Sequence, residues 1–203
     1  WPAYHNLAVV LAQRAEKEVS DKVRRAYLRR AAVNFTLAAH RNPTAELFYR
    51  VAAAYHRAGD KLEALQNYDY AIKLGGPRPV LSKIFADKAA LEIEIGQLDD
   101  ALRSLSYSTR TYQNLMNRAL IYVLKGNYPG AADLYQEALG LRPQDPLLHY
   151  CLAVVAARQQ NEPAVALHLR HAVALDRAYA TRAVEDLEFR DFAKGKPFLE
   201  ALR

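Results

Sequence analysis

Small and apolar residues return every three to four positions along most of the chain, and Gly, Asn or Pro interrupts them at intervals. The pattern is clearest over residues 112–143. This spacing places the side chains on one face of a helix, and Gly126-Asn127 marks a turn between two such helices. The positions that share the spacing are Leu115, Ala119 and Tyr122 before the turn and Ala131, Tyr135 and Ala138 after it. The stretch therefore predicts one helix–turn–helix unit, which Pro143 ends.

The same spacing predicts helices over almost the whole chain. They are expected at residues 3–18, 22–39, 79–95, 99–108, 146–159, 163–175 and 178–192, with two more in 45–74 and a last turn at 198–202. The side chains expected to face inward from residues 22–39 are Val23, Ala26, Tyr27, Ala31, Phe35 and Ala38. Composition agrees with helices, because Gly and Pro are scarce. The pattern resumes after the break at residues 75–79, so we expect a long loop there and not a domain boundary.

The predicted turns show that the chain repeats. Gly59, Gly96, Gly126 and Gln160 lie 37, 30 and 34 residues apart. Similar side chains recur around two of these turns: Phe48, Tyr55, Ala64, Tyr68 and Ala71 in one set, and Leu115, Tyr122, Ala131, Tyr135 and Ala138 in the other. With these residues the chain resembles the tetratricopeptide-repeat (TPR) family, whose repeat is 34 residues long. Residues that depart from the family pattern are Lys88, Glu92, Arg118, His149 and Ala156.

The resemblance implies the fold. It predicts an all-α protein, a right-handed TPR-type superhelix (α-solenoid) of antiparallel helix pairs with a C-terminal capping helix. We expect a single array over residues 1–203. Its expected parts are a divergent helix pair at 3–43, repeats at 45–77, 79–110, 112–145 and 146–175, and a capping helix and tail at 176–203.

The resemblance also implies a binding surface, because ligands of this family lie on the concave face that the first helix of each pair lines. The positions of this chain that match the face are Tyr49, Arg50, His56, Arg57, Asp87, Met116, Asn117, Leu120, Val123, Tyr150 and Val154. The N-terminal half of this set is charged and the C-terminal half is apolar. We expect the apolar half to bury partner side chains, while Arg50, His56 and Arg57 attract an acidic segment. The alternative is that the tail or a second copy of the chain covers the apolar half.

The predicted function is that of a non-catalytic scaffold that binds another protein or a peptide in this groove. The alternative is a structural or self-associating domain of a larger protein or assembly, in which flanking regions carry the function. TPR domains that bind a chain's C-terminal carboxylate use Lys, Asn and Arg on this face, whereas this chain has Tyr49, Ala53, Asp87 and Gln113 there. That mode of binding is therefore disfavoured.

Charge favours an ordinary surface over a nucleic-acid interface. The net charge is +6, and the first sixty residues hold 10 Lys and Arg against 5 Asp and Glu. The densest basic cluster is Arg24, Arg25, Arg29 and Arg30. A nucleic-acid surface would also carry interleaved aromatic residues. Only Tyr27 lies in this stretch, and it fits the helix core better, so nucleic acid is not the expected partner.

No motif for metal binding, cofactor binding or catalysis is present. The single cysteine, Cys151, excludes an intramolecular disulfide and sits in an apolar helical run. His149, His168 and His171 come together on neighbouring helices, but no carboxylate or cysteine completes a recognisable zinc spacing. A phosphate-binding glycine loop, a nucleophile elbow and an HExxH motif are all missing. We therefore predict no enzyme activity, metal or cofactor.

The compartment stays open in the sequence. No apolar run is long enough to cross a membrane, and the N-terminus does not resemble a signal peptide. A chain without disulfides is compatible with both the cytoplasm and a bacterial periplasm. Because the chain opens with Trp1-Pro2, we expect it to be a processed chain or an excised piece.

Overall fold

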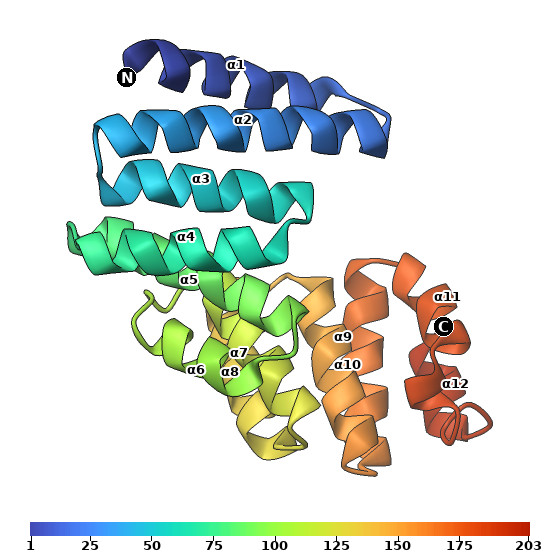
Figure 1. Ribbon diagram of the computed structural model, residues 1–203. Coiled ribbons are helices and arrows are strands. Elements are labelled where there is room, and N and C mark those ends of the chain that lie inside the picture. Colours follow the sequence, from blue (N-terminus) through green and yellow to red (C-terminus); the bar gives the residue numbers. More distant parts are fainter. The chain divides into compact units, whose positions relative to one another are not determined.

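The structure is a computed structural model that describes all residues, Trp1–Arg203, and contains helices but no strand (Figure 1). Consecutive helices pack on one another as antiparallel pairs, so the predicted all-α array of helix pairs is confirmed. The α-helices are α1 (Pro2–Lys17), α2 (Asp21–Arg41), α3 (Ala45–Ala58), α4 (Lys61–Leu74), α5 (Arg78–Glu94), α6 (Leu98–Ser106), α7 (Tyr112–Leu124), α8 (Tyr128–Leu141), α9 (Pro146–Arg158), α10 (Glu162–Leu175), α11 (Ala178–Glu185) and α12 (Lys196–Ala201). None of these helices is both long and apolar enough to span a bilayer.

The chain divides into two compact units. Unit 1 covers Trp1–Thr109 and holds α1 to α6, and unit 2 covers Arg110–Arg203 and holds α7 to α12. The boundary falls between two predicted repeats and not at the Gly- and Pro-rich loop before α5. Each unit is therefore described by itself.

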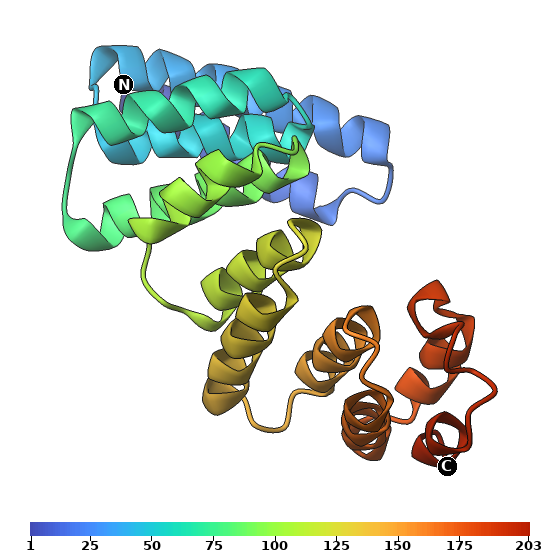
Figure 2. The same ribbon diagram turned by 90° about the horizontal axis from the view of Figure 1, so that it is seen from below.

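Unit 1 is a stack of helices in which neighbours along the chain lie side by side (Figures 1 and 2). Alanine stands where helix axes come close, because its small side chain lets two backbones approach. The fully buried alanines that serve this purpose include Ala8, Ala31, Ala52, Ala64 and Ala71. Tyr68 fills the space between the pairs and is almost completely buried.

Two residues of α2 differ from the prediction. Val23 and Ala26 were expected to face inward, but both are exposed. The buried face of α2 is formed by Leu28, Ala31, Ala32, Phe35, Ala38 and Ala39. The helix packs mainly against α1 and α3, and Val23 and Ala26 lie outside its buried face.

The predicted turns share one backbone conformation. Gly59, Gly96 and Gly126 have φ angles of 87°, 79° and 75°, in the left-handed region that suits glycine. Gln160 stands at the matching place with φ 56°, and it is the one non-glycine residue of the chain with a positive φ. The equivalence of the four turns, which defines the repeat, is thus visible in the backbone.

The tail of unit 2 differs from the prediction of one helix over 178–192. Helix α11 ends at Glu185, Asp186 is extended, and a short 3₁₀-helix follows at Leu187–Phe189 before α12. Three aromatic side chains of the tail are buried. These are Phe189, Phe192 and Phe198, which pack with α9 and α10 in one cluster. The tail still covers the end of the unit, but as a folded segment.

Candidate partner-binding surfaces

Helix α3 carries four of the predicted groove residues and lies between two hollows of unit 1. One hollow, of about 350 Å³, is lined by Glu46, Tyr49, Arg50, Pro79, Val80 and Lys83. The other, of about 160 Å³, is lined by Ala12, Leu28, Phe35, Tyr49, Arg50, Ala53, Ala54 and Arg57. Tyr49 and Arg50 border both hollows. The first-helix face of unit 1 is therefore recessed on both sides of these two residues.

Tyr49 links α3 to α5. Its hydroxyl donates a hydrogen bond of 2.6 Å to Asp87 Oδ2, and the Lys83 ammonium lies 5.3 Å from the centre of its ring. Burial and this hydrogen bond raise the pKa of Tyr49, so the hydroxyl stays protonated at neutral pH. Two predicted groove residues, Tyr49 and Asp87, thus meet in one contact that joins two helix pairs.

The three residues of unit 1 that were predicted to attract an acidic segment already have acidic partners. Arg50 Nη2 lies 2.8 Å from Glu46. His56 Nε2 lies 3.1 Å from a Glu94 oxygen, and Arg57 Nη2 lies 3.4 Å from a Glu16 oxygen. These pairs reduce the net positive charge that an approaching acidic segment would meet. Long-range attraction by these residues is therefore weaker than the sequence suggests.

In unit 2, α7 carries two clearly exposed apolar side chains, Leu120 and, at its C-terminal end, Leu124, and only Leu120 belongs to the predicted groove. Leu120 is 41% exposed, whereas Met116 and Val123 are half-buried against the core of the unit. Asn117 accepts a hydrogen bond of 3.2 Å from the Gln113 amide. Val154 of α9 is half-buried against the cluster that holds the tail. Of the predicted apolar stripe, Leu120 is the residue most available to a partner.

Tyr150 is not available to a partner, because the tail covers it. It is 2% exposed, and its hydroxyl donates a hydrogen bond to Asp186 Oδ2. The edge of its ring meets Phe189, and the Arg182 guanidinium lies 4.5 Å from the ring centre. The expected contribution of Tyr150 to an open groove does not hold, and the alternative that the tail folds back is realised at this residue.

The same arrangement occurs one repeat earlier. Tyr112 donates its hydroxyl to Asp145 Oδ2 at 2.7 Å, while Asp145 Oδ1 accepts the Leu147 backbone N–H at 2.9 Å and begins α9. Arg142 lies 4.0 Å from the Tyr112 ring centre. Asp186 likewise accepts a backbone N–H, that of Glu188 at 3.0 Å. In the sequence, this Tyr–Asp–Arg arrangement corresponds to an Arg three or four residues before an Asp, with a Tyr about one repeat upstream. The spacing of apolar residues does not reveal it.

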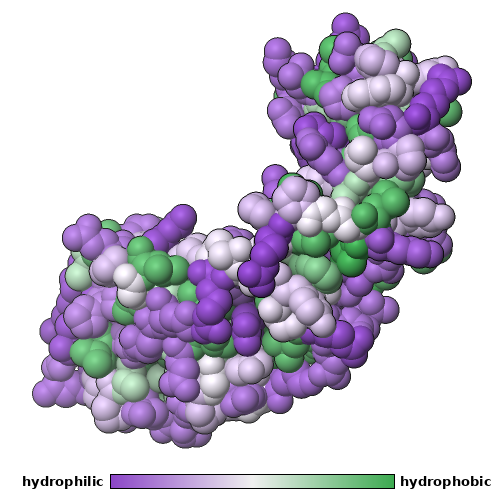
Figure 3. Space-filling view, turned by 90° about the vertical axis from the view of Figure 1, so that its left-hand side faces the viewer, coloured by the Kyte–Doolittle hydropathy of each residue, from purple (hydrophilic) through white to green (hydrophobic).

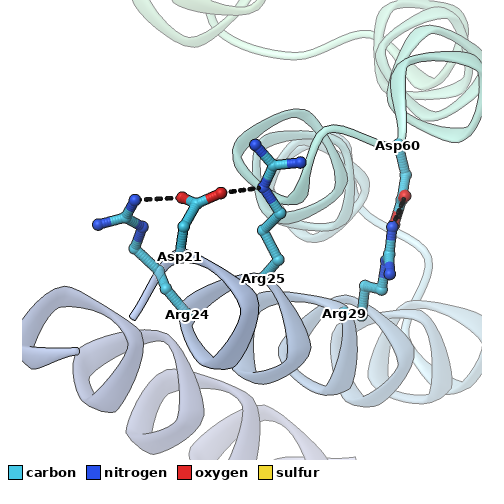
Figure 4. Close-up of polar contacts among 5 residues, drawn as sticks. All are labelled: Asp21, Arg24, Arg25, Arg29 and Asp60. Atoms are coloured by element: carbon cyan, nitrogen blue, oxygen red, sulfur yellow. Dashed lines mark hydrogen bonds and ion pairs between the residues drawn. The ribbon is translucent and has the colours of Figure 1, made fainter. Parts of the chain in front are cut away.

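Three of the four arginines in the basic cluster on α2 form ion pairs, with two carboxylates between them (Figure 4). Arg24 and Arg25 both pair with Asp21, the latter at 2.8 Å. Arg29 binds both oxygens of Asp60, the closest at 2.7 Å, and this contact lowers the pKa of the Asp60 carboxyl. Figure 4 shows the guanidinium of Arg29 side-on to that carboxylate. The arrangement is that of an ordinary ion-paired helix surface.

The three histidines lie together in unit 2. The His149 ring is 5.0 Å from His171 and 6.0 Å from His168, measured between ring centres. Burial and the neighbouring rings lower the pKa of His168 to about 4. No three His, Cys, Asp or Glu side chains in the structure are arranged to hold a metal ion. Burial also lowers the pKa of His149, so folding favours the neutral form of both His149 and His168.

Comparisons with known proteins agree with the helix-pair fold. Residues 119–160 match the family model described as TPR repeat. No curated protein matches the chain. The chain has the TPR fold. Among solved structures, it is similar to MamA 41-end from Desulfovibrio magneticus RS-1, with 22% identity, 86% of this chain and 96% of that chain covered, and a TM-score of 0.68.

Two further structures support the TPR fold. A tetratricopeptide repeat protein from Parabacteroides merdae shares 17% identity, covering 97% of this chain and 77% of that chain with a TM-score of 0.71. YrrB, described as a TPR protein with an unusual peptide-binding site, shares 16% identity over 90% of this chain and 91% of that chain, with a TM-score of 0.64. The resemblance found in the sequence is confirmed.

Hydropathy alone does not identify a binding surface on this protein. On the face drawn in Figure 3, hydrophilic residues predominate and hydrophobic residues form patches between them. Binding surfaces must therefore be identified from hollows and unpaired side chains, and not from overall hydropathy.

Proposed function

We propose that this TPR chain is a non-catalytic scaffold that binds a segment of another protein along the first helices of its pairs. In unit 1 the segment lies against Tyr49, Arg50 and Ala53 of α3. Unit 2 offers a surface of its own, on which a segment contacts Leu120 of α7, with Met116, Asn117, Val123 and Val154 beside it. The observation that carries the proposal is the pair of hollows on either side of Tyr49 and Arg50.

Two kinds of evidence support the proposal. A TPR neighbour, YrrB, is described as having a peptide-binding site, so the fold is compatible with this role. In addition, the hollows combine apolar walls with charged side chains at their rims, which is the usual composition of a site for an extended peptide. Binding energy comes from burial of partner side chains, and the paired cations contribute mainly to orientation.

The proposal can be tested with peptides selected on the full chain from a displayed random library. Ala53→Trp fills the smaller hollow, and Leu120→Glu places a charge on α7. We expect each change to weaken at least one class of selected peptide by about tenfold or more, since the tryptophan blocks the hollow and the glutamate replaces an apolar contact with a charge. Leu141→Glu is the control, because Leu141 lies on the second helix α8 of unit 2 and is also exposed.

Binding that survives both Ala53→Trp and Leu120→Glu would rule out the first helices as the site. The second candidate, a self-associating domain, is distinguished by size-exclusion chromatography with light scattering. A monomer favours partner binding. A dimer that Leu120→Glu dissociates would show that α7 serves assembly instead. Tyr150→Ala is unsuitable as a test of binding, because Tyr150 holds the tail.

A further inference from the structure

Unit 1 has a second apolar surface, on α2 and α4, which are the second helices of their pairs. Val33 and Leu37 of α2 are 50% and 41% exposed, and Tyr70 of α4 is 57% exposed. Leu74 of α4 is also exposed. Tyr70 and Leu74 also border a hollow of about 720 Å³, together with Thr36 and His40 on α2, Phe48 on α3 and Asp69 on α4, whereas Val33 and Leu37 lie outside its lining. Large apolar side chains gathered around a hollow mark an interaction surface.

Aromatic side chains form the wall of this hollow. Phe48 is buried, and the exposed Tyr70 ring stacks on it with 5.2 Å between the ring centres. The His40 ring meets Phe48 edge to face at 6.3 Å. The inner side of Tyr70 is thus fixed by packing while its outer side faces the solvent, so it can serve as a rigid anchor for an incoming side chain.

The exposed side of α2 has the spacing of a coiled-coil seam. Its exposed positions include Val23, Ala26, Arg30, Val33, Leu37 and His40. They follow one another at intervals of three and four residues, which is the a and d pattern of a heptad repeat. Such a seam is complementary to another α-helix lying alongside. The sequence pattern therefore indicates that an α-helix binds to this surface.

The unpaired positive charges on this surface indicate that the helix bound there is acidic. Arg30 lies in the seam and makes no ion pair, unlike Arg24, Arg25 and Arg29 beside it. Lys73 of α4 is exposed next to Leu74 and also makes no ion pair. The acid of the hollow, Asp69, is already 2.7 Å from Lys88. A second copy of this chain would bring like charges together, whereas an acidic helix would neutralise them.

We propose that α2 and α4 of unit 1 bind an amphipathic, acidic α-helix of another protein. Its apolar stripe lies along Val33 and Leu37, and one apolar side chain enters the hollow beside Tyr70. Acidic residues flanking that stripe pair with Arg30 and Lys73. The site is separate from the first-helix surface, so a partner can occupy both surfaces of unit 1 together.

The test uses two synthetic helical peptides with one heptad seam of leucines, flanked by glutamates in one peptide and by lysines in the other. Fluorescence anisotropy with the full chain should show binding of the glutamate peptide. Leu37→Glu should weaken it by at least about tenfold, because it removes an apolar contact and adds a repulsive charge. The matched control is Leu7→Glu on α1, where the leucine is 47% exposed, and it should leave binding unchanged.

A second pair of variants separates contact from folding. Tyr70→Ala should weaken binding, whereas Tyr107→Ala should not, although Tyr107 stacks on Phe85 at 4.9 Å in the same way. Arg30→Glu changes a surface charge without touching the core and should shift the preference toward the lysine peptide. Equal binding of both peptides, or binding of neither, would overturn the proposal. So would a dimer that Leu37→Glu dissociates in light scattering, since the occupant would then be a second copy.

Discussion

Tyr49 of unit 1 and Tyr150 of unit 2 stand at the same place in the repeat, ten residues before the turns at Gly59 and Gln160. Both hydroxyls donate to an aspartate of the next segment. Tyr49 remains half-buried beside two hollows, whereas Tyr150 is enclosed by the tail. The next part of the chain therefore decides whether this position belongs to a recessed surface or to the core. In unit 1 that part is another helix pair, and in unit 2 it is a folded cap.

Weakening the packing of the cap tests this comparison and should give the largest change in unfolding free energy. Phe198 is almost completely buried and contacts Phe189, with 5.9 Å between the ring centres. Phe198→Ala should destabilise unit 2 by about 3–5 kcal/mol, because it leaves a cavity under α12. Urea denaturation followed by circular dichroism measures the change. Leu199→Ala, at the exposed neighbouring residue, should cost no more than about 0.5 kcal/mol. Equal losses would show that the tail is not packed as described.

The two tyrosines can be compared directly by removing their hydroxyls. Tyr150→Phe should cost about 1–2 kcal/mol, since it leaves an oxygen of Asp186 without its donor beneath the tail. Tyr49→Phe should cost less than about 1 kcal/mol, because water in the adjacent hollows can replace the donor to Asp87. Thermal unfolding of both variants measures the difference. A larger loss from Tyr49→Phe would reverse the roles assigned to the two positions.

The helices and turns could be predicted from the sequence because both depend on local properties. Apolar spacing determines which face of a helix is buried, and glycine permits the backbone angles of turns such as Gly126. The exposure of Val23 could not be predicted, because a valine has the same spacing whether or not a neighbouring helix covers it. The contact of Asp186, where the predicted helix breaks, with Tyr150 could not be predicted either, because the two residues are far apart in the sequence.

The candidate site was predictable only in part, for a related reason. The resemblance placed Tyr49 and Arg50 on the first-helix face, where two hollows are found. It could not indicate that Glu16 of α1 pairs with Arg57, or that the tail encloses Tyr150. Both outcomes depend on side chains that compete for the same groups after folding. Spacing alone contains no information on that competition.

Acid should affect unit 2 through a group that unit 1 lacks. His168 faces His149 and His171, and its pKa is lowered to about 4 from an unfolded value of 6.5. The neutral ring is thus favoured by folding, so its contribution to stability is present above pH 6.5 and is lost as the pH falls toward 4. Allowing for partial exposure, the loss is on the order of 1 kcal/mol.

Urea denaturation at pH 7 and at pH 5 measures this effect. His168→Gln should reduce the difference in unfolding free energy between the two pH values, because glutamine does not titrate. His5→Gln in unit 1 is the control, since the edge of the His5 ring meets Phe35 but no other histidine. An unchanged pH dependence in His168→Gln would assign acid sensitivity to other groups.

The turns give the smallest expected change in stability, and here the substitution should stabilise the protein. Unit 1 has glycine at both left-handed turns, whereas unit 2 has Gly126 at one and Gln160 at the other, with φ 56°. A side chain in this conformation costs about 1 kcal/mol, so Gln160→Gly should stabilise unit 2 by up to that amount, less the greater entropy of glycine in the unfolded chain. Gly126→Gln is the reciprocal change and should destabilise the unit. Thermal unfolding measures both, and a lower melting temperature for Gln160→Gly would mean that the Gln160 side chain contributes more than its backbone strain costs.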